Sequence, residues 1–179
     1  MGGRFGPVHK LTAADEAGDF DCGQQELNLF LQRYALVNQR ANSAQTYVSC
    51  VDDAVVGYYS LCVGSVGFDE APHRVVKGLA RHRVPVMLLA RLGVDQRFQR
   101  QGLGRALLKD AILRTMQAAD IAGIRALLAH AKDEHALGHG QSVGPGALGE
   151  GLATLDEPGL EVLQSADGVE CGLGLDDLE

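Results

Sequence analysis

The sequence lacks the long apolar run, the leader segment and the cysteine pairs that mark several protein classes. None of its apolar runs approaches the roughly 18–20 residues that a membrane-spanning helix requires. The first four residues, Met-Gly-Gly-Arg, contain no apolar stretch of the kind found in secretory signals. Its four cysteines, Cys22, Cys50, Cys62 and Cys171, form no C-x-x-C pair, so we predict neither a zinc site nor a redox motif. These absences indicate a cytoplasmic protein without a metal.

Positive charge is missing from the last part of the chain. All 16 Lys and Arg residues lie within residues 1–136, beside 14 acidic residues, whereas residues 137–179 hold nine acidic residues and no basic one. The charge of residues 1–136 therefore permits binding to a nucleic acid, whereas the acidic tail would repel one. Residues 138–179 also contain ten glycines, no aromatic residue and no helix or strand period, so we predict no regular structure there. The sequence thus predicts a domain core over residues 1–136 and an atypical tail over 137–179.

The first half of the core predicts a helix followed by a hairpin. Apolar residues recur at the spacing of one helix face. The residues of this face are Leu27, Phe30, Leu31, Tyr34 and Ala35. Asp21 or a neighbour is placed to cap the start of this helix. Two β-rich segments follow, over residues 45–51 and 54–66, with Asp52-Asp53 as the turn between them. Residues 69–84 then read as a basic connector, either a solvated loop or a short helix.

The second half of the core predicts strand, helix and strand. Residues 86–94 are almost continuously apolar, which is typical of a strand buried on both faces. Gly93 near its end indicates a bulge or a close backbone approach. A helix is predicted from about residue 103 to 119, and another apolar strand over 124–131. This order implies a right-handed crossover between parallel strands.

A glycine-containing loop lies between the first of these strands and the helix, with the sequence Gln-Arg-Gln-Gly-Leu-Gly over residues 99–104. Glycines allow the backbone to approach a diphosphate, and the free amides at a helix start point at it. Arg97, Arg100 and Arg105 add positive charge. The loop lacks both the G-x-G-x-x-G dinucleotide fingerprint and the Lys-Ser/Thr ending of a P-loop.

The spacing Q-x-x-G-x-G at a strand-to-helix junction resembles the acetyl-CoA signature of the GNAT superfamily of N-acetyltransferases. The resemblance implies an α+β GNAT fold, with a mixed central β-sheet flanked by helices, and acetyl-CoA as the cofactor. The preceding Leu-Gly-Val matches the splayed strand whose backbone pairs with the pantetheine arm, while a bulge amide faces the thioester oxygen. The residues carried over in this way are Leu92, Gly93 and Val94 for the arm, and Gln99, Arg100, Gln101, Gly102, Leu103, Gly104 and Arg105 for the diphosphate.

A narrower resemblance, over residues 20–136, is to the acetyltransferase toxins of bacterial type II toxin–antitoxin systems. The matching segments lie at residues 20–23, 27–31, 38–39, 46–48, 56–61, 85–87 and 122–128. This resemblance implies acetylation of the α-amino group of aminoacyl-tRNA, neutralisation by a ribbon-helix-helix antitoxin, and homodimerisation. Two alternatives stay open: a GNAT enzyme for another amine, and an inactive remnant that keeps acetyl-CoA or antitoxin binding.

Five basic residues are candidates for contacts with RNA phosphates. They are Arg74, Lys77, Arg81, Arg83 and Arg91. Arg91 lies inside an apolar strand, so a purely structural role is an equal alternative for it.

The expected catalytic acid is missing. The resemblance implies a tyrosine near residue 140 that protonates the leaving CoA thiolate, but the sequence reaches Gly140 without one and has no tyrosine beyond Tyr59. The catalytic residue is therefore unknown: His139 and His130 are weak substitutes, and the sequence leaves open which of Tyr58 and Tyr59 faces the substrate groove. We hypothesise a frameshift near residue 136, with a divergent member carrying an acidic, disordered extension as the alternative.

Overall fold

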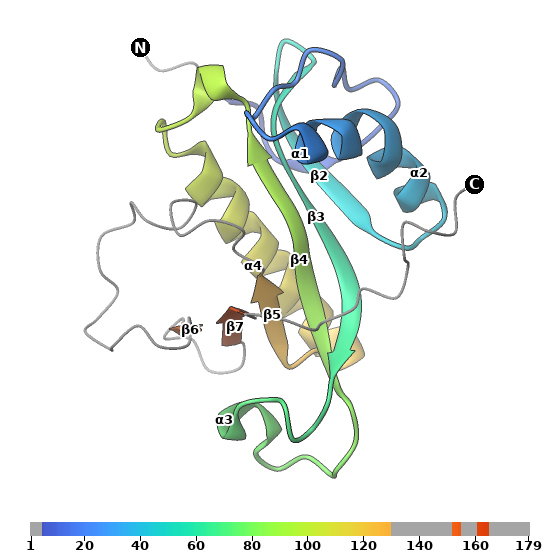
Figure 1. The fold of residues 1–179 in the computed structure, drawn as a ribbon, viewed down its shortest axis with the longest axis vertical. Coiled ribbons are helices and arrows are strands. Elements are labelled where there is room, and N and C mark those ends of the chain that lie inside the picture. Colours follow the sequence, from blue (N-terminus) through green and yellow to red (C-terminus); the bar gives the residue numbers. More distant parts are fainter. Residues whose placement is uncertain (1–4, 130–151, 155–160, 165–179) are drawn as a thin grey trace. The chain divides into compact units, whose positions relative to one another are not determined.

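A computed structural model describes residues 5–129, 152–154 and 161–164 of the protein (Figure 1). The structure divides into two compact units. The first comprises residues 1–62 and 89–114, and the second comprises residues 63–88 and 115–179. Two strands and one long helix run from one unit into the other. Among the helices of the described residues, none has the length and apolar character needed to cross a membrane.

The first unit is built on an antiparallel hairpin. The short strand β1 (His9–Lys10) pairs with β2 (Gln45–Val51), and β2 pairs with β3 (Ala54–Val66). Asp52 and Asp53 form the turn with φ angles of +49° and +68°, which is the left-handed geometry of tight hairpin turns and one that Asp tolerates. The predicted hairpin is therefore confirmed. In this unit the strand order is β1-β2-β3-β4, where β4 is Val84–Val94.

The predicted first helix forms in three pieces, α1 (Gln25–Leu29), a π-helical turn η1 (Phe30–Tyr34) and α2 (Ala35–Arg40), beside β2 in Figure 1. In the π turn the amide of Ala35 donates to the carbonyl of Phe30, five residues back. The extra residue in the turn directs the Tyr34 side chain away from the core, and Tyr34 is 37% exposed. Phe30 and Ala35 stay buried. Tyr34 was predicted on the buried face, and that prediction is wrong because the π turn interrupts the helical period.

The two faces of β3 carry two different packing layers. Tyr58 packs with Phe20 (ring centroids 5.5 Å apart) and Phe30 (6.3 Å) beneath the α1–α2 segment. The other face receives the start of α4 (Leu103–Ala122), as predicted for a helix beginning at residue 103. A Cβ at Gly57 would lie only 2.9 Å from methyl carbons of both Leu103 and Leu107, so the absent side chain lets α4 pack closely on the strand.

The second unit contains the ends of β3 and α4, the start of β4, and four short elements. A single-turn helix α3 (His73–Val76) lies in the basic connector, as the sequence allowed. Strand β5 (Ala126–Ala129) pairs in parallel with β7 (Glu161–Gln164), which pairs antiparallel with β6 (Leu152–Thr154). The last two strands lie where no regular structure was predicted. They are three and four residues long, too short for a period-2 signal to stand out.

Candidate functional site

The end of β4 is a place of close backbone approach. A Cβ at Gly93 would lie 3.1 Å from a ring carbon of Tyr58, 3.4 Å from Phe20 and 3.5 Å from the sulfur of Cys22. Gly93 is buried, whereas Leu92 and Val94 on either side are partly exposed. The prediction of a close approach at Gly93 is confirmed. The group that approaches the glycine most closely is the ring of Tyr58.

The loop after β4 joins this strand end to α4. It consists of a short 3₁₀ turn η2 (Gln96–Phe98) followed by residues 99–102 (Figure 1). Arg100 and Gly102 have φ angles of +61° and +86°, so the backbone reverses twice before the helix begins. The amide of Ala106 donates to the carbonyl of Gly102. The amides of the first helical turn, at residues 103–105, have no carbonyl of their own helix to donate to.

The charges near these amides favour an anion. Arg100 and Arg105 are exposed at the loop and in the first turn of α4, and no acidic residue lies in that turn. Gly104 is partly buried, and a Cβ there would make ordinary contact with Val94 at 3.6 Å. Free amides, a helix start and two guanidinium groups form a donor set that fits a diphosphate.

Two of the three glutamine side chains of the loop, Gln99 and Gln101, hold its shape by bonding to backbone carbonyls. Gln99 donates through Nε2 to the carbonyls of Val94 (3.0 Å) and Cys22 (3.1 Å), which joins the loop to the end of β4. Gln101 donates to the carbonyl of Arg97 (3.1 Å). Both residues belong to the predicted diphosphate set, and their side-chain amides bind the protein's own backbone.

Arg97 has a different role from the one its sequence position indicates. Its guanidinium donates through Nε and Nη2 to the two oxygens of Asp95, each at 2.9 Å. Asp95 is 1% exposed and also accepts from the backbone amides of Asp21 and Arg97. Hydrogen bonds from Arg97 hold the pKa of Asp95 below its ordinary value, against the opposing effect of burial. Arg97 is thus committed to Asp95, and the prediction that it adds free positive charge to the loop is wrong.

Asp21 ties the segment before α1 to the same loop. Its carboxylate accepts from the amide of Gly23 (2.9 Å), the side chain of Asn28 (2.8 Å) and the side chain of Gln96 (3.0 Å). These bonds lower the pKa of Asp21, the one from Gly23 first. The N-cap residue of α1 is Gln24, which makes no side-chain cap bond. The prediction that Asp21 or a neighbour caps the helix is therefore wrong, because Gln24 makes no cap bond and the Asp21 oxygens accept from Gly23, Asn28 and Gln96 instead.

The two adjacent tyrosines of β3 are both fully buried, and neither faces an open groove. The hydroxyl of Tyr58 donates to the carbonyl of Leu27 (2.8 Å), and that of Tyr59 donates to Asp110 on α4 (2.5 Å). Burial is the main cause that raises the pKa of each hydroxyl. The expectation that one of the two tyrosines faces the substrate groove is wrong. Side chains alternate along a strand, so Tyr58 is buried on the side of α1 and Tyr59 is buried on the side of α4.

Asp110 belongs to a cluster that the sequence analysis missed. Arg114, one turn further along α4, donates to the same Asp110 oxygen at 2.8 Å and lies over the ring of Tyr47 (4.1 Å). Tyr47 in turn stacks on Tyr59 with ring centroids 5.2 Å apart. The spacing of Asp110 and Arg114, four residues apart on a helix, is the one sequence signal that indicates part of this cluster.

The predicted RNA-binding residues lie in different surroundings. In the second unit Arg74, Lys77, Arg81 and Arg83 are all exposed. Arg81 forms an ion pair with Asp69 (2.6 Å) and lies over the ring of Phe68, so part of its charge is offset. Arg83 donates to the hydroxyl and carbonyl of a neutral residue, Ser65, and keeps its full charge.

Arg91 lies in the first unit and has a structural contact. Its guanidinium carbon is 3.9 Å from the centre of the Phe30 ring, on the π turn. This cation–π contact attaches the strand to the helical segment. The sequence left open whether Arg91 binds RNA or has a structural role. The contact with Phe30 supports the structural role. The positions relevant to the missing acid, His130, His139 and Gly140, lie outside the described residues.

Comparison with known proteins places this architecture in a family. The chain matches the acetyltransferase (GNAT) family over residues 10–139. It is 42% identical over 136 residues to a tRNA-acetylating toxin of Mycobacterium tuberculosis, an alignment that covers 76% of this chain and 81% of the toxin. Among solved structures, it is similar to AtaT complexed with acetyl-methionyl-tRNAfMet, with a TM-score of 0.68, 29% identity, and coverage of 73% of this chain and 80% of AtaT.

A second solved structure extends the comparison. It is a tyrosine-to-phenylalanine mutant of the AtaT toxin bound to the C-terminus of the antitoxin AtaR and to acetyl-CoA. Its TM-score is 0.60 at 31% identity, and the alignment covers 73% of this chain and 77% of the mutant. The family match spans most of the chain, including β4, the loop and α4. The chain therefore belongs to the GNAT family of acetyltransferases.

Proposed function

We propose that this protein is an acetyl-CoA-dependent N-acetyltransferase of the toxin type, which acetylates the α-amino group of aminoacyl-tRNA and so blocks translation. The observation that carries the proposal is the 42% identity to a tRNA-acetylating toxin over 136 residues. The likeness to AtaT in complex with an acetylated aminoacyl-tRNA supports the same substrate class.

The site's own residues provide donors that suit the cofactor of such a reaction. The amides at residues 102–105, with Arg100 and Arg105, hold the diphosphate of acetyl-CoA. The backbone of Leu92 to Val94 pairs with the pantetheine arm, and the close packing of Gly93 on Tyr58 fixes that backbone. Acetyl-CoA supplies the activated thioester. An α-amino group has a pKa of about 8, so a useful fraction is neutral and nucleophilic at neutral pH without a strong base.

Exposed basic residues are proposed to contact the phosphates of the RNA. Lys77 and Arg83 carry this role in the second unit, with Arg74 beside them and Arg81 contributing less because of Asp69. Arg91 is assigned to structure instead, since its guanidinium lies on Phe30.

The proposal extends to partners. An AtaT relative is bound to the C-terminus of an antitoxin, and we propose that a ribbon-helix-helix antitoxin neutralises this protein as well. We further propose a homodimer and, because charged tRNA is the substrate, a cytoplasmic location. A genetic neighbour that encodes a ribbon-helix-helix protein would support the first of these, and its absence would count against it.

A second candidate function is an inactive scaffold that binds acetyl-CoA or the antitoxin without turnover. One specific observation favours it: no tyrosine follows Tyr59 in the sequence. The loss of a general acid slows a reaction by about 10²–10⁴-fold. A mutant toxin that lacks a tyrosine has been captured with acetyl-CoA, which supports retention of the cofactor without the acid.

We also propose that the chain divides into a core at residues 1–136 and an atypical tail at residues 137–179. A frameshift near residue 136 is proposed as the origin of the tail. The change in composition at that point supports both. Resequencing the gene across codons 130–145 tests the frameshift. A second frame that restores a tyrosine near position 140 would support it, and an uninterrupted frame with a folded tail would exclude it.

Two assays on the full chain separate the candidates. Calorimetry measures acetyl-CoA binding, and transfer of a labelled acetyl group is measured with bulk aminoacyl-tRNA, uncharged tRNA and free amines as acceptors. Binding with transfer to charged tRNA alone supports the toxin activity. Binding without any transfer supports the scaffold, and transfer only to free amines supports a different GNAT substrate.

A further inference from the structure

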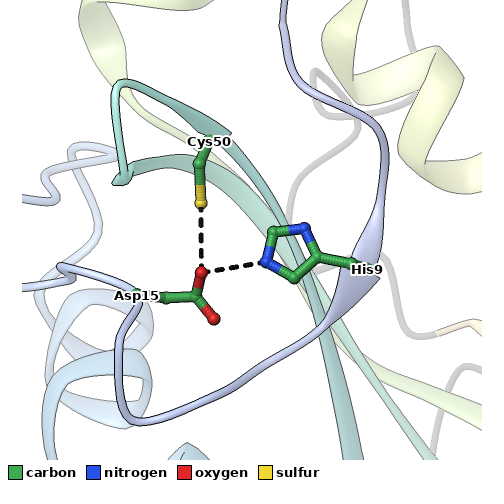
Figure 2. Close-up of side chains that lie close together, drawn as sticks. All are labelled: His9, Asp15 and Cys50. Atoms are coloured by element: carbon green, nitrogen blue, oxygen red, sulfur yellow. Dashed lines mark hydrogen bonds and ion pairs between the residues drawn. The ribbon is translucent and has the colours of Figure 1, made fainter.

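Three potential metal ligands from separate parts of the chain meet in the first unit, and none of them is a residue assigned to acetyl-CoA (Figure 2). His9 lies on β1, Asp15 on the turn after it, and Cys50 at the bulge of β2. Their ligand atoms all lie within 4.8 Å of one another. Figure 2 shows the imidazole and the thiol pointing at the same carboxylate oxygen of Asp15.

The imidazole of His9 is oriented as a metal ligand would be. Its Nδ1 lies 3.2 Å from the carbonyl of Pro7, and because a carbonyl only accepts, Nδ1 carries the hydrogen. The other nitrogen, Nε2, lies 2.9 Å from Oδ1 of Asp15. Metal-binding histidines usually donate from one ring nitrogen to a backbone carbonyl or carboxylate, which orients the other nitrogen toward the metal.

Asp15 is held so that one oxygen faces the cluster. Its Oδ2 accepts from the amide of Thr12 (2.7 Å) and from the Thr12 hydroxyl (2.9 Å). Its Oδ1 is left to face both Nε2 of His9 and Sγ of Cys50, the latter at 3.7 Å. The Asp15 side chain is only 10% exposed, so the carboxylate is fixed and largely shielded.

We propose that His9, Asp15 and Cys50 form a zinc-binding site with water as the fourth ligand. Imidazole, carboxylate and thiolate together favour Zn²⁺, whereas Mg²⁺ and Ca²⁺ require mostly oxygen ligands. On binding, the ion lies between Nε2 of His9, Oδ1 of Asp15 and Sγ of Cys50, and the Cys50 thiol gives up the proton that it now donates to Oδ1. The absence of a C-x-x-C pair predicted no zinc site, but these ligands come from three segments that only the fold brings together.

Two of the three ligand spacings are close to those of a tetrahedral site, and the third, between Nε2 of His9 and Sγ of Cys50, is at most 4.8 Å. With bonds of about 2.0–2.3 Å, tetrahedral ligand atoms lie about 3.3–3.6 Å apart. The oxygen–sulfur distance of 3.7 Å already fits, and the nitrogen–oxygen distance of 2.9 Å must lengthen by about 0.4 Å. The His9 side chain is 42% exposed against 10% for Asp15, so the imidazole is the ligand with more room to adjust.

The bound ion would fasten the N-terminal segment to the hairpin. Strand β1 is only two residues long, and backbone bonds such as the one from Gly6 to Cys50 (2.8 Å) hold the neighbouring segment. A metal that joins β1, the following turn and β2 cross-links this edge of the sheet. The site is separate from acetyl transfer, so its test does not depend on the proposed enzymatic activity.

Cobalt substitution in the full-length chain tests the site, in a Cys171→Ser background that removes the thiol outside the described residues. We expect one Co²⁺ per chain with a thiolate-to-metal absorption band, displaced by Zn²⁺ and unaffected by Mg²⁺ or Ca²⁺. Cys50→Ser abolishes the band, and the buried-thiol control Cys62→Ala keeps it. The proposal is overturned if the chain with Cys50 intact shows no band, or if the Cys50→Ser variant retains the band. In either case the cluster is only an ion pair between His9 and Asp15.

Thr12→Val gives a second test that keeps every ligand. Loss of the hydroxyl bond to Asp15 is expected to weaken zinc affinity by about 10–100-fold, the usual effect of removing a group that hydrogen-bonds to a metal ligand. Thr115→Val, a threonine outside the cluster, is the control. Equal zinc affinities for the Thr12→Val variant and the wild type, in chains shown to be folded by circular dichroism, would contradict the assignment.

Discussion

At the scale of single residues, Gly93 and Asp95 fix the end of β4. Sequence reasoning identified Gly93, because a glycine near the end of an apolar strand indicates a close approach, and the Tyr58 ring provides one. It missed Asp95, since a single acidic residue after a strand looks like an ordinary loop residue. Only the fold buries that carboxylate and surrounds it with donors from Asp21 and Arg97.

Replacement of Gly93 by alanine is expected to destabilise the protein by about 1–3 kcal/mol. The new Cβ would lie 3.1 Å from Tyr58, whose ring is buried and whose hydroxyl is held by Leu27, so the ring has little room to move. Urea unfolding measures the change. Gly18→Ala is the control, because no atom lies within 4 Å of its added Cβ. Equal losses in both variants would refute the packing argument.

Replacement of Asp95 by asparagine is expected to cost about 1–3 kcal/mol at pH 7, because the Arg97 donors lose their charged partner. The folded-state pKa of Asp95 is lowered, so its contribution is fully present above the unfolded pKa of about 3.9 and is lost as pH falls through the folded value. The stability gap between wild type and variant should therefore narrow below about pH 4. A gap that stays constant down to pH 2, or one shared by the surface variant Asp120→Asn, would disprove this.

At the scale of elements, the hairpin, β4 and α4 could be predicted because each has a strong local signal. The Asp-Asp turn indicates the hairpin, and the continuous apolar run indicates β4. Apolar residues at i+4 spacing, Leu107/Ala111 and Leu108/Ile112/Met116, indicate α4. The π turn at Phe30–Tyr34 could not be predicted, because the apolar spacing is the same whether the helix gains a residue or not. Its consequence is the exposure of Tyr34 and the placement of Phe30 under Arg91.

Tyr59→Phe is expected to weaken the attachment of α4 to β3 by about 1–2 kcal/mol. The variant keeps the buried ring but removes the hydroxyl that donates to Asp110, leaving Arg114 as the partner on that oxygen. Thermal unfolding of Tyr59→Phe, Arg114→Gln and the double variant measures the coupling. Strictly additive losses would show that the two bonds to Asp110 do not act together.

The start of α4 is predicted to bind the diphosphate of acetyl-CoA. Arg105→Gln should raise the Kd for acetyl-CoA about tenfold, through loss of one charge-assisted hydrogen bond. Lys109→Gln removes the same charge one turn further along the exposed face and should leave Kd nearly unchanged. Calorimetric titration of both variants checks this, and a similar effect of the two substitutions would point to general charge rather than a site at the helix start.

At the scale of the whole molecule, the order of elements was predictable and the meeting of distant segments was not. The GNAT signature lies in one stretch of chain, so residues 92–94 and 99–105 could be proposed as the acetyl-CoA site from sequence alone. The His9–Asp15–Cys50 cluster draws on three stretches, and the network around Asp21 and Gln96 joins residues 75 positions apart. The periodicity of a single sequence segment cannot predict such contacts, because the packing of the core and the register of the strands determine which distant residues meet.

The proposed activity of this chain is the transfer of an acetyl group from acetyl-CoA to charged tRNA. The most direct measurement incubates the purified chain with labelled acetyl-CoA and aminoacyl-tRNA and identifies the N-acetyl-aminoacyl product after release from the tRNA. We predict label on the α-amino group of the amino acid, with none transferred to uncharged tRNA. Acetyl-CoA binding without any labelled aminoacyl product, under conditions in which a toxin relative is active, would contradict the claim.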